Sequence, residues 1–174
     1  MDTITPRSPT MMHPVALTSS LPQSRIRRPQ DVRLYLRTLH LQIPPGDTLM
    51  LALDQHHRPV GRHHFPYTPL HPLGPHPRDV FKAAFTQHAA RLILVSSHPH
   101  IRRGAFTPTD EQLNYAAQCS LAGQLLNLPL VDHLMLNETE LESLLLNFHD
   151  KLSRYALRYS QQHANPLLTN LCPN

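Results

Sequence analysis

Residues 90–100 have the sequence Ala-Arg-Leu-Ile-Leu-Val-Ser-Ser-His-Pro-His, and this stretch decides the fold. A short apolar run that ends in small hydroxyl residues and a His-Pro-His turn predicts a buried strand over residues 91–95. The polar residues that follow a strand lie at the edge of a sheet, where binding sites are commonly built. Whether these polar residues can hold a metal ion therefore decides which chemistry the protein can perform.

Helical and strand patterns alternate on both sides of this strand. Helices are expected over residues 29–41, 77–90, 107–127 and 138–158, and further strands over 48–54, 59–65 and 129–136. Thr107 is the expected N-cap of the third helix, with Pro108 in its first turn. The alternation predicts an α/β (α+β layered) domain with a mixed sheet flanked by helices.

The composition divides the chain into three parts. Residues 1–28 are rich in Ser, Thr, Pro and Met and are expected to form a disordered basic tail. Residues 29–148 are expected to form the domain, and residues 149–174 a helical extension that ends in a frayed tail.

Composition and charge exclude several classes of protein. No apolar stretch approaches the ~18 residues of a membrane span, and no signal-peptide pattern is present. Cys119 and Cys172 are too far apart for a disulfide framework, which indicates a reducing, cytoplasmic compartment. The 14 histidines lie mostly in predicted loops, where solvated imidazoles are commoner than metal ligands.

Several separated motifs occur in the order found in one known family. They are residues 51–58 (Leu-Ala-Leu-Asp-Gln-His-His-Arg), 76–80, 90–99, 107–109 and 131–133 (Val-Asp-His). Over roughly residues 30–145 the chain resembles the RadC family, whose members carry a JAB/MPN domain with the fold of JAMM zinc metalloproteases. The resemblance implies a curved mixed sheet flanked by helices.

The resemblance also implies a zinc hydrolase site. Active members of the family hold zinc with two histidines and one aspartate, and a glutamate polarises the metal-bound water. Such a ligand set leaves one coordination position open, so that the metal can lower the pKa of its water. The glutamate then accepts the proton of that water.

This chain departs from the family pattern at most of these positions. His98 keeps the second histidine, but Ser96 occupies the first, and Gln112 occupies the position of the aspartate. The glutamate position falls on Gly46, whereas Thr109 conservatively matches a family serine. Hydroxyl and amide oxygens are poor zinc ligands beside imidazole and carboxylate. We therefore expect a degenerate family member with zinc absent or weakly bound and a non-catalytic or binding role.

A rebuilt metal site is the main alternative. His98 and His100 form a His-x-His pair, and Asp110 and Glu111 stand at the start of the following helix. These residues could supply a shifted site for a zinc metallohydrolase. Asp47 is a poor substitute for the lost glutamate, because neighbouring strand residues face opposite sides of a sheet.

Two further interpretations rest on weaker patterns. The resemblance implies a DNA-repair-associated accessory role, for which Arg25, Arg27 and Arg28 are the candidate phosphate contacts. The sequence 96–98 suggests a Ser-His hydrolase, but nothing marks an orienting third group or an oxyanion hole. Asp132 and His133 are expected to be a satisfied polar pair.

Overall fold

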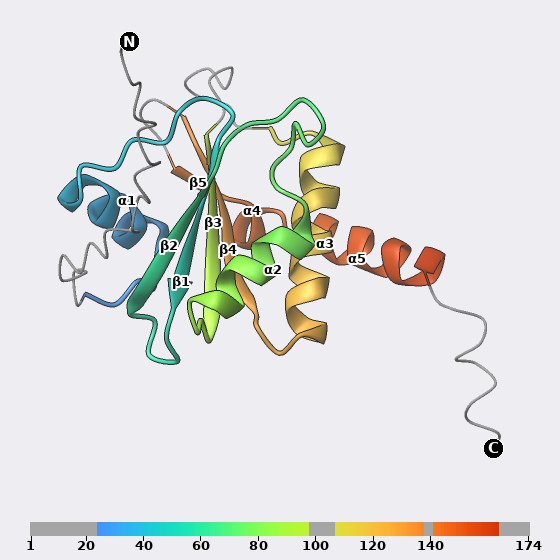
Figure 1. The fold of residues 1–174 in the computed structure, drawn as a ribbon. Coiled ribbons are helices and arrows are strands. Elements are labelled where there is room, and N and C mark those ends of the chain that lie inside the picture. The colour runs from blue at the N-terminus through green and yellow to red at the C-terminus, as the bar shows by residue number, and fades with distance from the viewer. Residues whose placement is uncertain (1–23, 98–106, 138–140, 164–174) are drawn as a thin grey trace, which may run out of the picture.

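The computed structural model describes residues 24–97, 107–137 and 141–163. Figure 1 shows a layered arrangement in which helices cover a central sheet. The elements, in chain order, are α1 (Pro29–Thr38), β1 (Thr48–Leu53), β2 (Pro59–Phe65), α2 (Pro77–Thr86), β3 (Arg91–Ser97), α3 (Asp110–Leu125), β4 (Leu130–Leu136), β5 (Leu141–Ser143), α4 (Leu144–Asn147) and α5 (His149–His163).

The five strands form one mixed sheet in the order β2-β1-β3-β4-β5. Neighbouring strands are antiparallel except β3 and β4, which are parallel and are joined by the crossover helix α3. Every residue of β1 and the middle of β3 are buried. Strands with near-continuous apolar sequence are expected where both faces of a sheet are covered. Strand β3 is therefore the centre of the fold.

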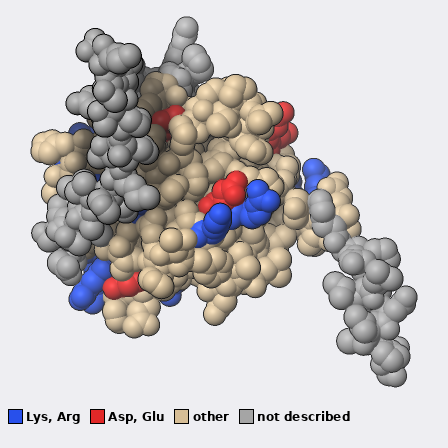
Figure 2. All heavy atoms as spheres, in the orientation of Figure 1, with Lys and Arg blue, Asp and Glu red and all other residues tan. Residues whose placement is uncertain are grey.

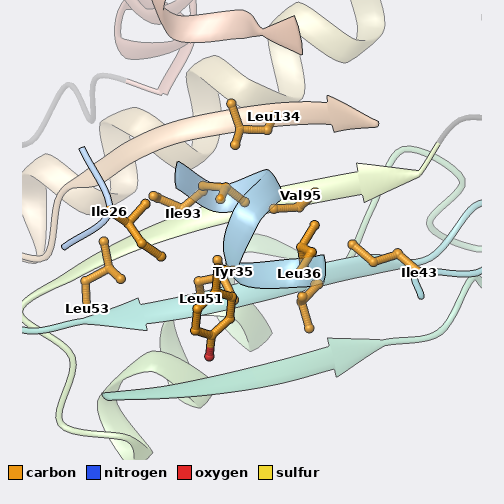
Figure 3. Packing of buried hydrophobic residues seen from close by; sticks show 11 residues of the cluster. Ile26, Tyr35, Leu36, Ile43, Leu51, Leu53, Ile93, Val95 and Leu134 are labelled. Atoms are coloured by element: carbon orange, nitrogen blue, oxygen red, sulfur yellow. The ribbon is translucent and has the colours of Figure 1, made fainter. Parts of the chain in front are cut away.

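Helix α1 covers one face of the sheet. Figure 3 shows its Tyr35 and Leu36 pointing onto apolar side chains of β1, β3 and β4. Alternate residues of β1, Leu49, Leu51 and Leu53, belong to this cluster. The period of two along the strand sends the residues between them to the other face.

Helices α2 and α3 cover the opposite face. Their buried residues Phe81 and Cys119 pack with Met50 and Ala52 of β1 and with Leu94 of β3. Burial raises the pKa of the Cys119 thiol to about 12, although a hydrogen bond with Tyr115 has the opposite, smaller effect. Helix α5 packs on the outside of α3, where Leu152 joins Leu113, Ala116 and Ala117.

The structure confirms the predicted fold class and corrects several element boundaries. The third helix begins two residues later than expected: its N-cap is Thr109, not Thr107. The predicted helix over residues 138–158 is partly wrong, because Leu141–Ser143 pairs as β5 with the end of β4. This short edge strand lacks the apolar run or clear alternation that would reveal it in the sequence.

Residues 24–28, assigned to the tail from composition, pack against the domain. The Ile26 side chain is 1% exposed in the core beneath α1, and its amide donates to the carbonyl of His57. The packed part therefore begins before Pro29. The predictions for residues 1–23 and 164–174 concern parts outside the described residues. Within the described ranges, no helix is long and apolar enough to cross a membrane.

Candidate functional site

The family resemblance places a site where the start of β1 meets the end of β3. The Gly46 amide donates to the Ser97 carbonyl at 2.8 Å, and the Ser97 amide donates to the Asp47 carbonyl at 2.9 Å. Thr48 is the partner of Ser96 in the antiparallel pairing of the two strands. The structure therefore brings the positions of the lost glutamate and the lost histidine together at one edge of the sheet.

Ser96, which the resemblance matches to the first histidine, is part of a buried hydrogen-bond chain. Its Oγ lies 3.0 Å from Thr48 Oγ1 and 2.9 Å from His133 Nε2. Ser96 and His133 are each 1% exposed, and Thr48 is 2% exposed. Buried polar groups are stabilised only when they are hydrogen-bonded, so this arrangement is what a structural core position requires. It also keeps the hydroxyl away from any substrate in solvent.

His133 links this hydrogen-bond chain to α3. Its ring makes an edge contact with Tyr115, at a centroid distance of 5.7 Å, and Tyr115 donates from its hydroxyl to the Pro75 carbonyl at 2.7 Å. The sequence patterns alone do not connect His133 with Ser96, although both side chains face α3. Their shared face follows from the period of two along each strand, but their pairing depends on the β3–β4 register.

Gln112, which the resemblance matches to the metal aspartate, caps its own helix. The Thr109 amide donates to Gln112 Oε1 at 2.9 Å, and the Gln112 amide donates to Thr109 Oγ1 at 3.2 Å. This reciprocal pair is a capping box, which satisfies two backbone amides at the start of α3. Gln112 Oε1, the oxygen that would have to replace a zinc-binding carboxylate, therefore accepts a hydrogen bond that caps the N-terminus of α3.

Gly46, which the resemblance matches to the general base, has a backbone that disfavours a glutamate. Its φ is +87°, a conformation that L side chains rarely adopt. A Cβ atom built there would lie 3.0 Å from the Tyr67 ring. Any side chain at residue 46 would thus be strained by the backbone and crowded by Tyr67. The local structure therefore disfavours the glutamate that the resemblance would place at residue 46.

Asp47, next to Gly46, is hydrogen-bonded to residues at and after the end of β2. Its carboxylate accepts from the Tyr67 amide at 2.7 Å and lies 2.7 Å from His64 Nε2. The side chain is buried, and these contacts join the start of β1 to the end of β2. Asp47 therefore anchors the segment that follows β2.

The residues of the rebuilt alternative are only partly described. His98 and His100 lie outside the described residues. Asp110 is exposed on α3, and its carboxylate is hydrogen-bonded to Tyr155 on α5, which raises the pKa of that phenol. Glu111 is also exposed. Asp110 thus has a partner on the helix packed against α3.

Asp132 and His133 do not form a dyad. His133 faces α3, whereas Asp132 lines a pocket of about 290 Å³ beside α1 together with Ile93 and Leu134. Asp132 accepts from the Ser143 hydroxyl at 2.9 Å and from the Leu145 amide at 3.3 Å. The two side chains have different side-chain partners because they lie on opposite faces of β4, although the His133 backbone amide also donates to the Asp132 carboxyl. Both polar side chains are hydrogen-bonded, as the sequence led us to expect.

The buried carboxyl of Asp132 leads to a pH-dependent prediction. Burial raises its pKa above the ordinary 3.8, while hydrogen bonds from the Ser143 hydroxyl and from the amides of Leu145 and His133 lower it less. The folded chain therefore binds this proton more tightly than the unfolded chain, and its contribution to stability falls as pH rises from 3.8 through the raised pKa. Asp132→Asn keeps an acceptor oxygen and removes the charge. Urea denaturation should show the variant gaining stability relative to the native chain across that interval, with no further gain above it.

Asp54→Asn is the matched control for this measurement. Hydrogen bonding from the Arg58 amide is the main cause that lowers the pKa of Asp54, so its ionised form stabilises the fold. This contribution is present above 3.8 and is lost as pH falls through the lowered pKa. The Asp54 variant should therefore lose stability relative to the native chain as pH rises. The same sign of change in both variants would contradict the role assigned to Asp132.

We call the positions matched to the family zinc site, residues 46, 96 and 112, the inherited site. A second hollow lies beside it, between the loop after β2 and the start of α2. It has a volume of about 180 Å³, and its lining includes Gly46, Tyr67, His71, His76 and Asp79. A helix was expected from residue 77 onward, and α2 begins there. In the structure the Arg78 amide donates to His76 Nδ1 at 3.1 Å, which makes His76 the N-cap of α2.

These contacts do not fit the zinc ion that the resemblance implies. At the positions that the resemblance matches to the zinc ligands, the Ser96 hydroxyl and the Gln112 side-chain amide are already hydrogen-bonded within the protein. At the position matched to the base, Gly46 has no side chain. Zinc in catalytic sites is bound by imidazole, thiolate or carboxylate groups. Among the described residues, no three His, Cys, Asp or Glu side chains are grouped so that they could hold a metal ion.

Comparison with known proteins decides the family. A family model described as "RadC-like JAB domain" matches residues 26–149. The chain belongs to this family. The expectation drawn from the sequence motifs is therefore confirmed, and the five-stranded mixed sheet with flanking helices agrees with a JAB domain.

Curated relatives of this JAB domain share only part of their length with it. The UPF0758 protein tlr1707 of Thermosynechococcus vestitus is 35% identical over 95 residues, which are 55% of this chain and 37% of the relative. A UPF0758 protein of Clostridium perfringens is 27% identical over 127 residues, or 72% of this chain and 54% of the relative. The names of these relatives state no activity.

Proposed function

We propose that this JAB domain is a binding module in which the zinc hydrolase site of active family members has become part of the core. The observation that carries the proposal is the placement of Ser96 Oγ between Thr48 and His133 at 3.0 and 2.9 Å, with all three residues buried. Without an ordered zinc ion, water keeps a high pKa and hydrolysis lacks its usual nucleophile. The capping role of Gln112 and the backbone of Gly46 support the same conclusion.

Zinc binding by the purified full chain tests this proposal. The protein is stripped with a chelator, dialysed against excess zinc and then against buffer, and its metal content is measured by mass spectrometry. We expect far less than one zinc per chain, because a single family histidine cannot provide the ~10 kcal/mol or more of structural zinc sites. Since the chain has 14 histidines, weakly bound zinc is expected to be unaffected by His98→Ala.

Three variants distinguish the rebuilt site from adventitious metal. His98→Ala, His100→Ala and Glu111→Gln each remove a candidate ligand, and His56→Ala removes an exposed histidine of the β1–β2 turn as a control. One zinc per chain that is lost in the first three variants and kept in the control would contradict the proposal. It would instead favour a metallohydrolase with a shifted site.

A further inference from the structure

The net positive charge of the chain comes from one short segment. Residues 25–42 contain five of the 16 basic residues and one of the 12 acidic residues, so the segment carries +4 and the rest of the chain is balanced. The basic residues are Arg25, Arg27, Arg28, Arg33 and Arg37. The segment comprises α1 and the residues on both sides of it. By contrast, the basic and acidic side chains around α2 lie beside one another on a mostly uncharged face (Figure 2).

Part of this charge borders a groove on the α1 side of the sheet. The groove has a volume of about 500 Å³ and lies between the C-terminal half of α1, the residues that follow it and the end of β4. Arg33, Arg37 and His40 contribute its basic lining. The two arginines are four residues apart and therefore lie on the same face of the helix. Two guanidinium groups are thus presented to one opening.

The same groove has an apolar component. Leu36, Leu41 and Leu136 line it, and Leu36 is continuous with the buried cluster beneath α1. None of the described lining residues is Phe, Tyr or Trp, so the groove offers no large ring on which a nucleic-acid base would stack. A phosphodiester backbone is charged and offers little apolar surface for the leucines to contact. A ligand that satisfies the whole groove carries negative charge and apolar side chains together.

The described part of the chain does not neutralise these arginines. No carboxylate there lies within 4.0 Å of the guanidinium of Arg33 or Arg37. Asp31, the acidic residue of the segment, is bound by Arg28 and by the amides of residues 27 and 28. Glu142 and Arg33 both line a neighbouring hollow, but the Glu142 carboxylate accepts from the Asn147 side chain and forms no ion pair with Arg33. The charge is therefore available to an external partner.

We propose that the α1 groove binds an acidic, amphipathic segment of a partner protein. Carboxylates of the segment pair with Arg33 and Arg37, and its apolar side chains cover Leu41 and Leu136. Clustered charges steer association, while desolvated apolar contacts at the centre provide most of the affinity. The groove is on the sheet face opposite Ser96 and His133. This interaction is consequently independent of the inherited site and of its metal content.

Fluorescence anisotropy with a defined probe tests this proposal on the full chain. The probe is a labelled 12-residue peptide made of two repeats of Asp-Leu-Glu-Glu-Leu-Asp. We expect binding that weakens with salt, because exposed charge pairs are screened. Arg33→Gln/Arg37→Gln should weaken it about tenfold, as expected for the loss of two charge pairs. Arg154→Gln/Arg158→Gln on α5, the same change of charge on exposed residues elsewhere, should change it less than about twofold.

Altered probes and one further variant complete the experiment. A peptide with Asn and Gln for the acids, and one with Ser for the leucines, should both bind more weakly. Glu138→Gln/Glu140→Gln, which alters two acids that follow the groove residue Leu136 in the sequence, should leave binding unchanged or tighter. Absence of peptide binding, equal losses in the two arginine variants, loss in the glutamate variant, or tighter binding of a 20-base-pair DNA duplex at the same arginines would overturn the proposal.

Discussion

Leu94→Ala is expected to lower the free energy of unfolding by about 3 kcal/mol, the middle of the range for large-to-small changes in a core. Leu94 is fully buried on the central strand β3, where it packs with residues of α2 and α3. The truncation removes apolar contacts and leaves a cavity that the covered strand cannot collapse to fill. The midpoint of thermal unfolding should fall by roughly 6–12 °C.

Leu34→Ala is the matched control for this prediction. Leu34 has the same side chain but is 63% exposed on α1, so its removal should change stability by less than about 0.5 kcal/mol. Urea denaturation measures both variants, and an unchanged slope would confirm that the unfolded states are comparable. A small loss for Leu94→Ala would mean that β3 is not the closely packed centre of the sheet.

Ser96→His is expected to destabilise the domain by about 2–4 kcal/mol, although histidine is the residue that the family pattern places there. The larger ring must enter a site that is 1% exposed, and overpacking of this kind costs about 1–3 kcal/mol. The substitution also breaks the hydrogen bonds with Thr48 and His133. Buried polar groups left without partners cost about 1–3 kcal/mol.

Ser96→Ala separates these two contributions. It removes the same hydrogen bonds but adds no volume, so its cost should be about 1–3 kcal/mol and smaller than that of the histidine variant. Urea denaturation and zinc analysis are performed on both. A histidine variant with native stability that takes up one zinc per chain would show that the site still accepts the family ligands. That result would contradict the proposed loss of the metal centre.

Most of the fold could be predicted from local sequence patterns. The bounds of β2 agree with the prediction of residues 59–65. Pro59 and the Pro-rich segment after Phe65 mark its two ends in the sequence, because proline has no amide to donate to a neighbouring strand. β1 and β3 could be predicted because a short, continuous apolar run indicates a strand that is buried on both faces of the sheet. β5 was missed because a three-residue edge strand depends on pairing with β4 and has little pattern of its own.

The candidate site was predictable as a set of positions but not as a set of contacts. Comparison with the family motifs showed that Ser96, Gln112 and Gly46 lack zinc-ligand or base chemistry. Only the structure revealed their present contacts, because the partner of Ser96 lies 37 residues away on a neighbouring strand. The separation of Asp132 from His133 likewise follows from the two faces of β4, which adjacent positions in a sequence conceal.

The sequence by itself indicated the family, the central strand and the residue types at the positions matched to the family zinc ligands. These properties are encoded locally, in apolar runs, turn residues and the identity of single side chains. Tertiary structure alone decided that Ser96 is buried between Thr48 and His133, and that Arg33 and Arg37 share a groove with Leu136 of β4. Both depend on distances between distant segments, which are set by strand register and by the packing of α1 on the sheet.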